Sequence, residues 1–137
     1  MLYIGDSITD VEPLAFVRAN NGISISFNGN EYPLKVAEIA IVSPNAVPTV
    51  LIANVYADND KNKVLEFIDE YNGADDYEKL FEKYGIDLEI KSRFLDVFDG
   101  EEYPIIQIVD EDNFDDILKV SKEMRNNIRG KDIGGLG

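Results

Sequence analysis

The stretch Leu-Tyr-Ile-Gly-Asp-Ser-Ile-Thr-Asp at residues 2–10 joins a short apolar run to the start of a helix. Residues 2–4 favour a buried β-strand, and Gly5 lets the chain turn sharply where that strand ends. From Val11 onward apolar residues recur at helical spacing, with Pro13 near the first turn, where proline is tolerated. A strand, a Gly-Asp turn and a helix in this order predict the first unit of an α/β fold.

Three further segments, residues 23–27, 39–42 and 105–109, have the composition of strands. The apolar spacing predicts a helix over residues 11–19, a second over residues 47–56 and several more after residue 58. We therefore predict an α/β fold with a small, mainly parallel, Rossmann-like sheet covered by helices and a helix-rich C-terminal half.

The length of 137 residues favours a single α/β domain over residues 1–137. Residues 1–57 hold 5 acidic and 2 basic side chains, whereas residues 58–130 form an acidic, helix-rich segment. Gly130 is expected to end the last helix, because glycine weakens a helix interior, and residues 131–137 are expected to form a flexible tail.

The composition excludes several kinds of chemistry. The chain has no cysteine and no histidine, which rules out disulfides, thiolate nucleophiles, histidine bases and histidine metal ligands. The 27 acidic and 13 basic residues give a net charge of −14, which argues against binding to nucleic acid or to an anionic membrane surface. No apolar run reaches the length of a membrane span, so we expect a cytoplasmic protein.

The polar residues of the strand-to-helix turn are suited to a hard cation. Asp6 leaves the carboxyl end of the predicted strand, and Asp10 follows four residues later. Carboxylates with retained waters suit magnesium, while Ser7 and Thr9 add hydroxyls beside a helix N-terminus that favours an anion such as phosphate. The spacing alone favours a helix cap that binds no ligand, because Asp, Ser and Thr are preferred at that position.

The order of the elements from residue 2 to residue 43 resembles part of the haloacid dehalogenase superfamily, in its phosphoserine-phosphatase-like branch. The family's motif IV has the form Gly-Asp-x-x-x-Asp, which here is Gly5-Asp6 followed by Asp10. A helix, an apolar strand ending near Phe-Asn and a strand announced by a small residue and an acid follow, as they do here at residues 11–19, 23–28 and 37–41.

The resemblance implies half of the family's sheet and a magnesium site. Residues matching Asp6 and Asp10 serve the catalytic magnesium in the family, the first most directly. Gly5, Ser7, Thr9 and Asn28 would line the site or contact a phosphate. Thr9 stands where phosphoserine phosphatases usually have asparagine, which argues against phosphoserine as the substrate.

The family's nucleophile, an aspartate in an Asp-x-Asp-x-Thr motif, precedes motif IV and has no counterpart in this sequence. Two downstream segments, residues 58–60 and 110–112, have Asp-x-Asp spacing. Neither carries the threonine, and a connector or a helix cap explains both. We therefore expect the C-terminal part of a magnesium-dependent phosphohydrolase, inactive by itself, with magnesium bound weakly or not at all. The alternative is a non-catalytic interaction or regulatory module.

The first strand has a consequence for assembly. In the family the strand before motif IV pairs with the strand of the nucleophile, which this sequence lacks. Residues 2–4 would then form a sheet edge, and such an edge is normally covered. We expect it to be covered by residues 105–109, by a second copy in a homodimer, or by a separate N-terminal half of the haloacid dehalogenase fold.

Overall fold

The structure is a computed structural model that describes the backbone of residues 1–136 and the side chains of residues 1–129. Its elements, in chain order, are β1 (Leu2–Gly5), the 3-10 helix η1 (Ile8–Asp10), α1 (Val11–Ala19), β2 (Ile23–Phe27), α2 (Glu31–Val36), β3 (Ile39–Val42), α3 (Val47–Ala57), α4 (Lys61–Gly73), α5 (Tyr77–Lys83), α6 (Leu88–Val97), β4 (Ile105–Ile108) and α7 (Phe114–Leu136).

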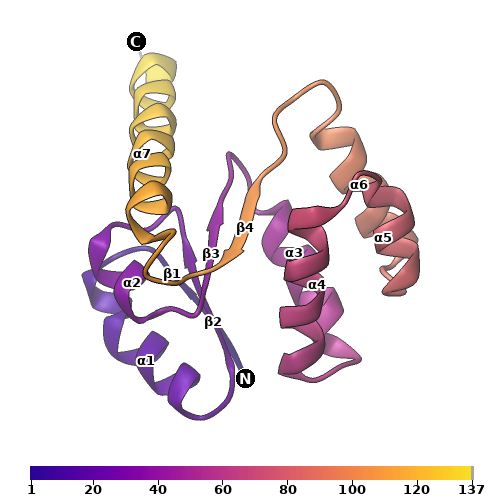
Figure 1. Cartoon of the computed structure of the whole chain (residues 1–137). Helices are drawn as coiled ribbons and strands as arrows, with labels where there is room; N and C mark the ends of the chain where they lie inside the picture. The colour runs from indigo at the N-terminus through magenta and orange to yellow at the C-terminus, as the bar shows by residue number, and fades with distance from the viewer. Residues whose placement is uncertain (137) are drawn as a thin grey trace.

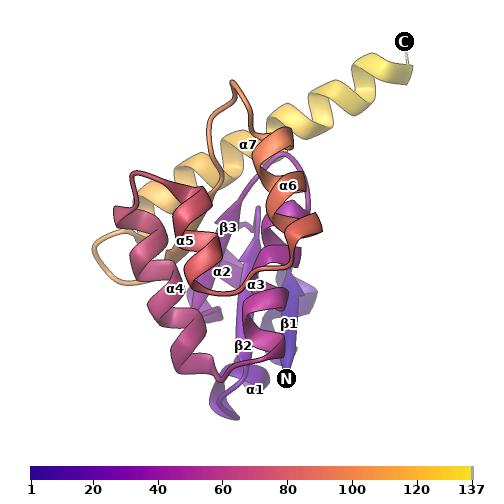
Figure 2. The same cartoon turned by 90° about the vertical axis from the view of Figure 1, so that its right-hand side faces the viewer.

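The sheet confirms the predicted α/β class. Its strand order is β1-β2-β3-β4, and the pairs β1–β2 and β2–β3 are parallel. Helices α1, α2 and α7 lie on one face, and α3 to α6 lie on the other (Figure 1). Turned by 90°, the molecule shows α3 to α6 in front of the sheet, with α7 running behind it (Figure 2).

The last strand runs against the other three. β4 pairs with β3 in antiparallel register, with Ile106 opposite Ile41 and Ile105 opposite Val42. The expectation that residues 105–109 cover the edge at residues 2–4 is therefore wrong. The physical reason lies in β3, whose residues are all buried, so its free edge needs a partner more than the half-exposed β1 does.

Two clusters of buried side chains flank the sheet. The larger cluster joins strand residues such as Ile25 and Ile41 to aromatic residues of α4, α5 and α6, among them Phe67, Phe81 and Phe94. The smaller cluster packs Leu34 of α2 and Ile117 of α7 on the other face. Side chains from residues 1–57 and from the acidic segment thus meet in the same core.

The last helix is longer than the sequence predicts. α7 continues through Gly130 to Leu136, although we expected the helix to end at Gly130 and a tail to follow. Glycine costs only about 1 kcal/mol relative to alanine inside a helix, so it disfavours helical backbone without forbidding it. Gly137 lies outside the described residues. Over residues 1–136, no helix is both long and apolar enough to cross a membrane.

Candidate functional site

The loop after β1 lies at the carboxyl ends of the parallel strands, beside the end of β2 and next to α7. Glycine is required at its first position, since a Cβ atom on Gly5 would lie 2.4 Å from the Cβ of Asp10. This close approach folds residues 6–10 back on the end of the strand. The carboxyl end of a parallel sheet is the usual place for ligands in open α/β folds.

Asp10 holds the loop closed. Its Oδ2 accepts hydrogen bonds from the backbone N–H of Asp6 at 2.9 Å and of Ser7 at 3.2 Å. Its Oδ1 accepts one from the hydroxyl of Tyr3 at 2.8 Å. These bonds, that of the Asp6 N–H first, lower the pKa of the Asp10 carboxyl, while the same carboxylate raises the pKa of Tyr3.

Asp6 is the more available carboxylate. Its side chain is 62% exposed, and its Oδ2 lies 3.7 Å from Nη1 of Arg125 on α7. The same Nη1 donates hydrogen bonds at 2.9 Å to the backbone carbonyls of Asp6 and Asn28. Arg125 therefore joins the ends of β1 and β2 through one guanidinium nitrogen.

The other predicted lining residues are held by local contacts. The hydroxyls of Ser7 and Thr9 lie 2.9 Å apart and hydrogen-bond to each other. The side-chain amide of Asn28 donates to the carbonyl of Ser43 at 2.8 Å and accepts from its N–H at 2.9 Å. The Asn28 side chain thus fastens the end of β2 to the end of β3, and its backbone carbonyl contacts Arg125.

The loop after β1 supplies only some of the ligands that a magnesium ion requires. Over the described residues, no group of three acidic side chains is placed to hold a metal. Magnesium is commonly held by one or two carboxylates together with waters and phosphate oxygens. Asp6 suits this role, whereas the oxygens of Asp10 already accept several hydrogen bonds. A complete site needs donors from outside this loop.

The two downstream Asp-x-Asp segments lie elsewhere. Asp60 caps α4 by accepting a hydrogen bond from the N–H of Lys63 at 3.0 Å. Asp110 and Asn113 exchange hydrogen bonds of 2.8 Å at the start of α7. Because β4 runs antiparallel to the other strands, its carboxyl end, with Asp110, lies at the opposite end of the strands from Asp6. Neither segment reaches the loop after β1.

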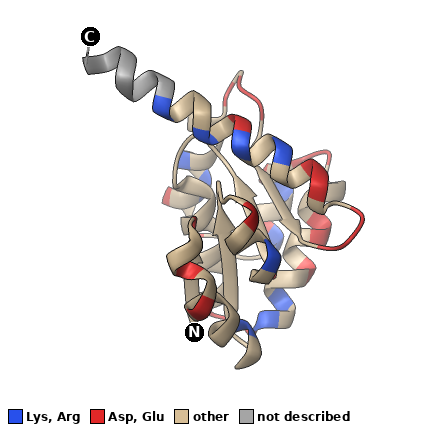
Figure 3. Ribbon diagram, turned by 90° about the vertical axis from the view of Figure 1, so that its left-hand side faces the viewer, with Lys and Arg blue, Asp and Glu red and all other residues tan. Residues whose placement is uncertain are grey.

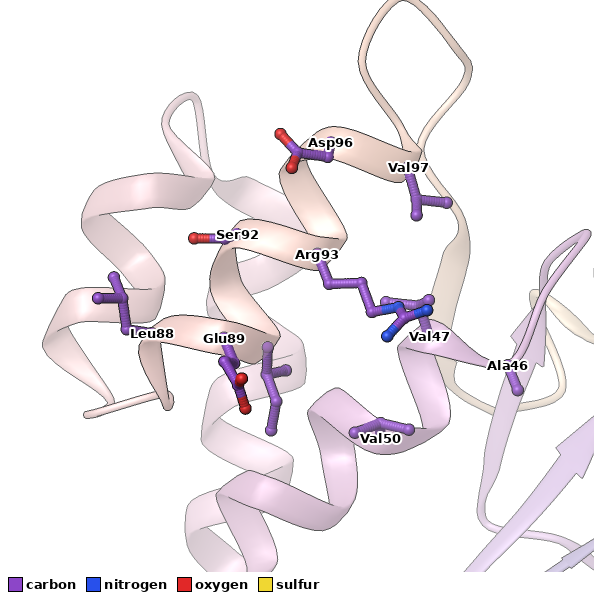
Figure 4. A pocket seen from close by; sticks show the side chains of 10 residues that line it. Ala46, Val47, Val50, Leu88, Glu89, Ser92, Arg93, Asp96 and Val97 are labelled. Carbon is purple, nitrogen blue, oxygen red and sulfur yellow. The ribbon is translucent and has the colours of Figure 1, made fainter.

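A larger groove lies between α3 and α6. Its volume is about 1020 Å³, and apolar residues such as Val47, Val50 and Leu88 line it. Figure 4 shows the Arg93 side chain extending across it toward Val47. Its charged residues Glu89, Arg93 and Asp96 all come from α6, and they do not converge on one point in the groove (Figure 4). This groove is therefore an apolar surface between two helices, without converging charged side chains.

Replacing Asp10 with alanine is expected to destabilise the fold by about 1–2 kcal/mol, because the N–H groups of Asp6 and Ser7 lose their acceptor. The folded-state pKa of Asp10 is lowered below 3.8, so its contribution is present above that pH and is lost as pH falls through the folded value. Urea unfolding between pH 7 and pH 2.5 measures the effect. Asp58→Ala, at an exposed carboxylate after α3, is the matched control. Equal stability of the two variants at pH 7 would contradict the assignment.

Comparisons with known proteins identify a structural relative. No protein-family model matches this chain, and no curated protein matches it. The chain is similar to the structure of gene product AF1437 from Archaeoglobus fulgidus, with 26% sequence identity and a TM-score of 0.64. The match covers 93% of this chain and 31% of that chain, so the described fold corresponds to less than a third of the length of that relative.

Proposed function

We propose that this chain is the C-terminal part of a haloacid dehalogenase-like, magnesium-dependent phosphohydrolase. The observation that carries the proposal is the loop from Gly5 to Asp10 at the carboxyl end of β1. The loop is braced by Asp10 and leaves the Asp6 carboxylate exposed. In the completed protein Asp6 would hold magnesium, which polarises a phosphate ester for attack by a nucleophile.

The free edge of β1 supports this proposal. β1 pairs with β2 on one side and has no strand on its other side among residues 1–136. Ile4 and Met1, at this edge, are 38% and 56% exposed. A further parallel strand there would end beside Asp6, which is where a nucleophilic aspartate could meet the metal. This strand would come from another segment of a longer protein or from a separate N-terminal half.

A non-catalytic interaction module is the second candidate function. The same uncovered edge favours it, since unpaired backbone groups beside exposed apolar residues can pair with another chain. In that case the hydrogen bond from Arg125 to the Asp6 carbonyl would only stabilise the fold. A homodimer through β1 belongs to this candidate.

The chain alone is expected to hydrolyse no phosphomonoester. Covalent phosphoryl transfer needs an attacking carboxylate, and no aspartate follows a neighbouring strand at the carboxyl end of β1 within the described residues. The assay uses p-nitrophenyl phosphate with magnesium, with Asp6→Asn as the control. Turnover by the pure chain that Asp6→Asn abolishes would show that a nucleophile lies within this chain.

A further inference from the structure

A small cavity opens between α7 and the carboxyl ends of β1 and β2. Its volume is about 240 Å³, and Asp6, Phe27, Asn28, Arg125, Ile128 and Arg129 line it. Two of its charged residues are arginines from α7, one turn apart, so both project from the same side of the helix. The cavity is large enough for a small anionic group and too small for most organic cofactors.

Arg125 is fixed in place before any ligand binds. Its side chain is 19% exposed, and its Nη1 donates to the carbonyls of Asp6 and Asn28. Its Nε and Nη2 donate to no atom of the described residues. A guanidinium held at one nitrogen keeps its other donors in a fixed direction, which lowers the entropic cost of binding a planar or tetrahedral anion.

Arg129 adds a second positive charge with no acidic partner among residues 1–129. Its guanidinium is therefore free to contact an anion that enters the cavity. α7 carries both basic and acidic residues, and the loops before β4 and before α7 are acidic (Figure 3). Among the described residues that line the cavity, Asp6 carries the one carboxylate, and Arg125 lies beside it.

We infer that this cavity binds a phosphate group, with Arg125 and Arg129 as its ligands. Guanidinium forks match phosphate oxygens in geometry and stay charged at every physiological pH. That this phosphate belongs to a phosphoester substrate rests on the proposed function. α7 would then contribute to substrate binding beside the Asp6 loop.

The test is a titration of the ¹⁵N-labelled full chain with inorganic phosphate, without divalent metal. Binding is monitored by the NMR chemical shifts of the amides and of the Arg Nε groups. Saturating shifts are expected at Asp6, Ser7, Asn28 and the Nε of Arg125. Arg129→Gln should weaken phosphate binding about tenfold, the loss of one charge-assisted contact. Arg125→Lys should also weaken binding, since lysine keeps the charge and loses the fork. Sodium chloride at equal ionic strength separates specific shifts from screening.

Arg93→Gln is the matched control, because Arg93 is an arginine on α6 across the sheet. Binding like that of the unmodified chain supports the inference. Shifts that do not saturate, that chloride reproduces, or that Arg129→Gln leaves unchanged would overturn it. Because the titration contains no magnesium, failure of the proposed metal site would leave its result unaffected. An intact metal site without phosphate binding would overturn only the inference.

Discussion

Replacing Phe67 with alanine is expected to lower the free energy of unfolding by about 3–5 kcal/mol, the range for removing a large buried aromatic side chain. Phe67 is fully buried in the larger core cluster. Its ring packs edge-on against Tyr84, with 5.1 Å between centroids, and it also contacts Phe81 and Tyr71 at 6.0 and 6.3 Å.

The same substitution tests whether the two halves fold together. Because Phe67 shares a core with Ile25 and Ile41, the sheet and the acidic helices should unfold in one transition at a lower urea concentration. Far-ultraviolet circular dichroism and the amide signals of β2 follow the two parts separately. Phe16→Ala is the control, since Phe16 is 60% exposed and should cost about 0.5 kcal/mol or less. Separate transitions for the sheet and the helices would contradict a shared core.

Replacing Gly5 with alanine is expected to destabilise the fold by about 2–4 kcal/mol, because overpacking at a tight contact forces the backbone to shift. The new Cβ would lie 2.4 Å from the Asp10 Cβ and 2.8 Å from its Oδ2. Asp10 would have to move, and it would then lose the N–H groups of Asp6 and Ser7. The loop that carries Asp6 would open as a result.

Urea unfolding measures this loss, and Gly73→Ala provides the matched control. Gly73 lies at the end of α4, and nothing would come within 4 Å of a Cβ added there. Alanine at this position should leave stability unchanged or raise it by up to about 1 kcal/mol. A Gly5→Ala variant as stable as Gly73→Ala would mean that the loop is not closed on Asp10 in solution.

Much of the sheet could be predicted from local patterns. The alternating residues 23–27 and the apolar residues 39–42 form β2 and β3, because buried strands need continuous or alternating apolar side chains. The direction of β4 could not be predicted, since the composition of residues 105–109 does not indicate whether the strand runs parallel or antiparallel to its neighbour. Helix α2 was also missed. It is six residues long and contains Pro33, and its main local signal is the cap at Asn30.

The candidate site could be predicted in part. The position of Asp6 and Asp10 in one loop follows from the Gly-Asp turn. Their spacing does not distinguish a residue that binds a metal from one that only stabilises the loop by hydrogen bonds. The structure shows the bracing bonds of Asp10, while metal binding by Asp6 stays a prediction. The place of Arg125 beside this loop could not be predicted, because a contact across 119 residues leaves no local signal.

Magnesium binding at Asp6 tests the central claim most directly. We expect a magnesium titration of the ¹⁵N-labelled chain at low ionic strength to shift the amides of residues 5–9 with weak affinity. The affinity should be weak because one exposed carboxylate is a poor site without further ligands, and Arg125 lies 3.7 Å from it. Asp6→Asn should abolish these shifts, and Asp58→Asn should leave them unchanged. Tight binding, or shifts in residues 5–9 that survive Asp6→Asn, would contradict the account.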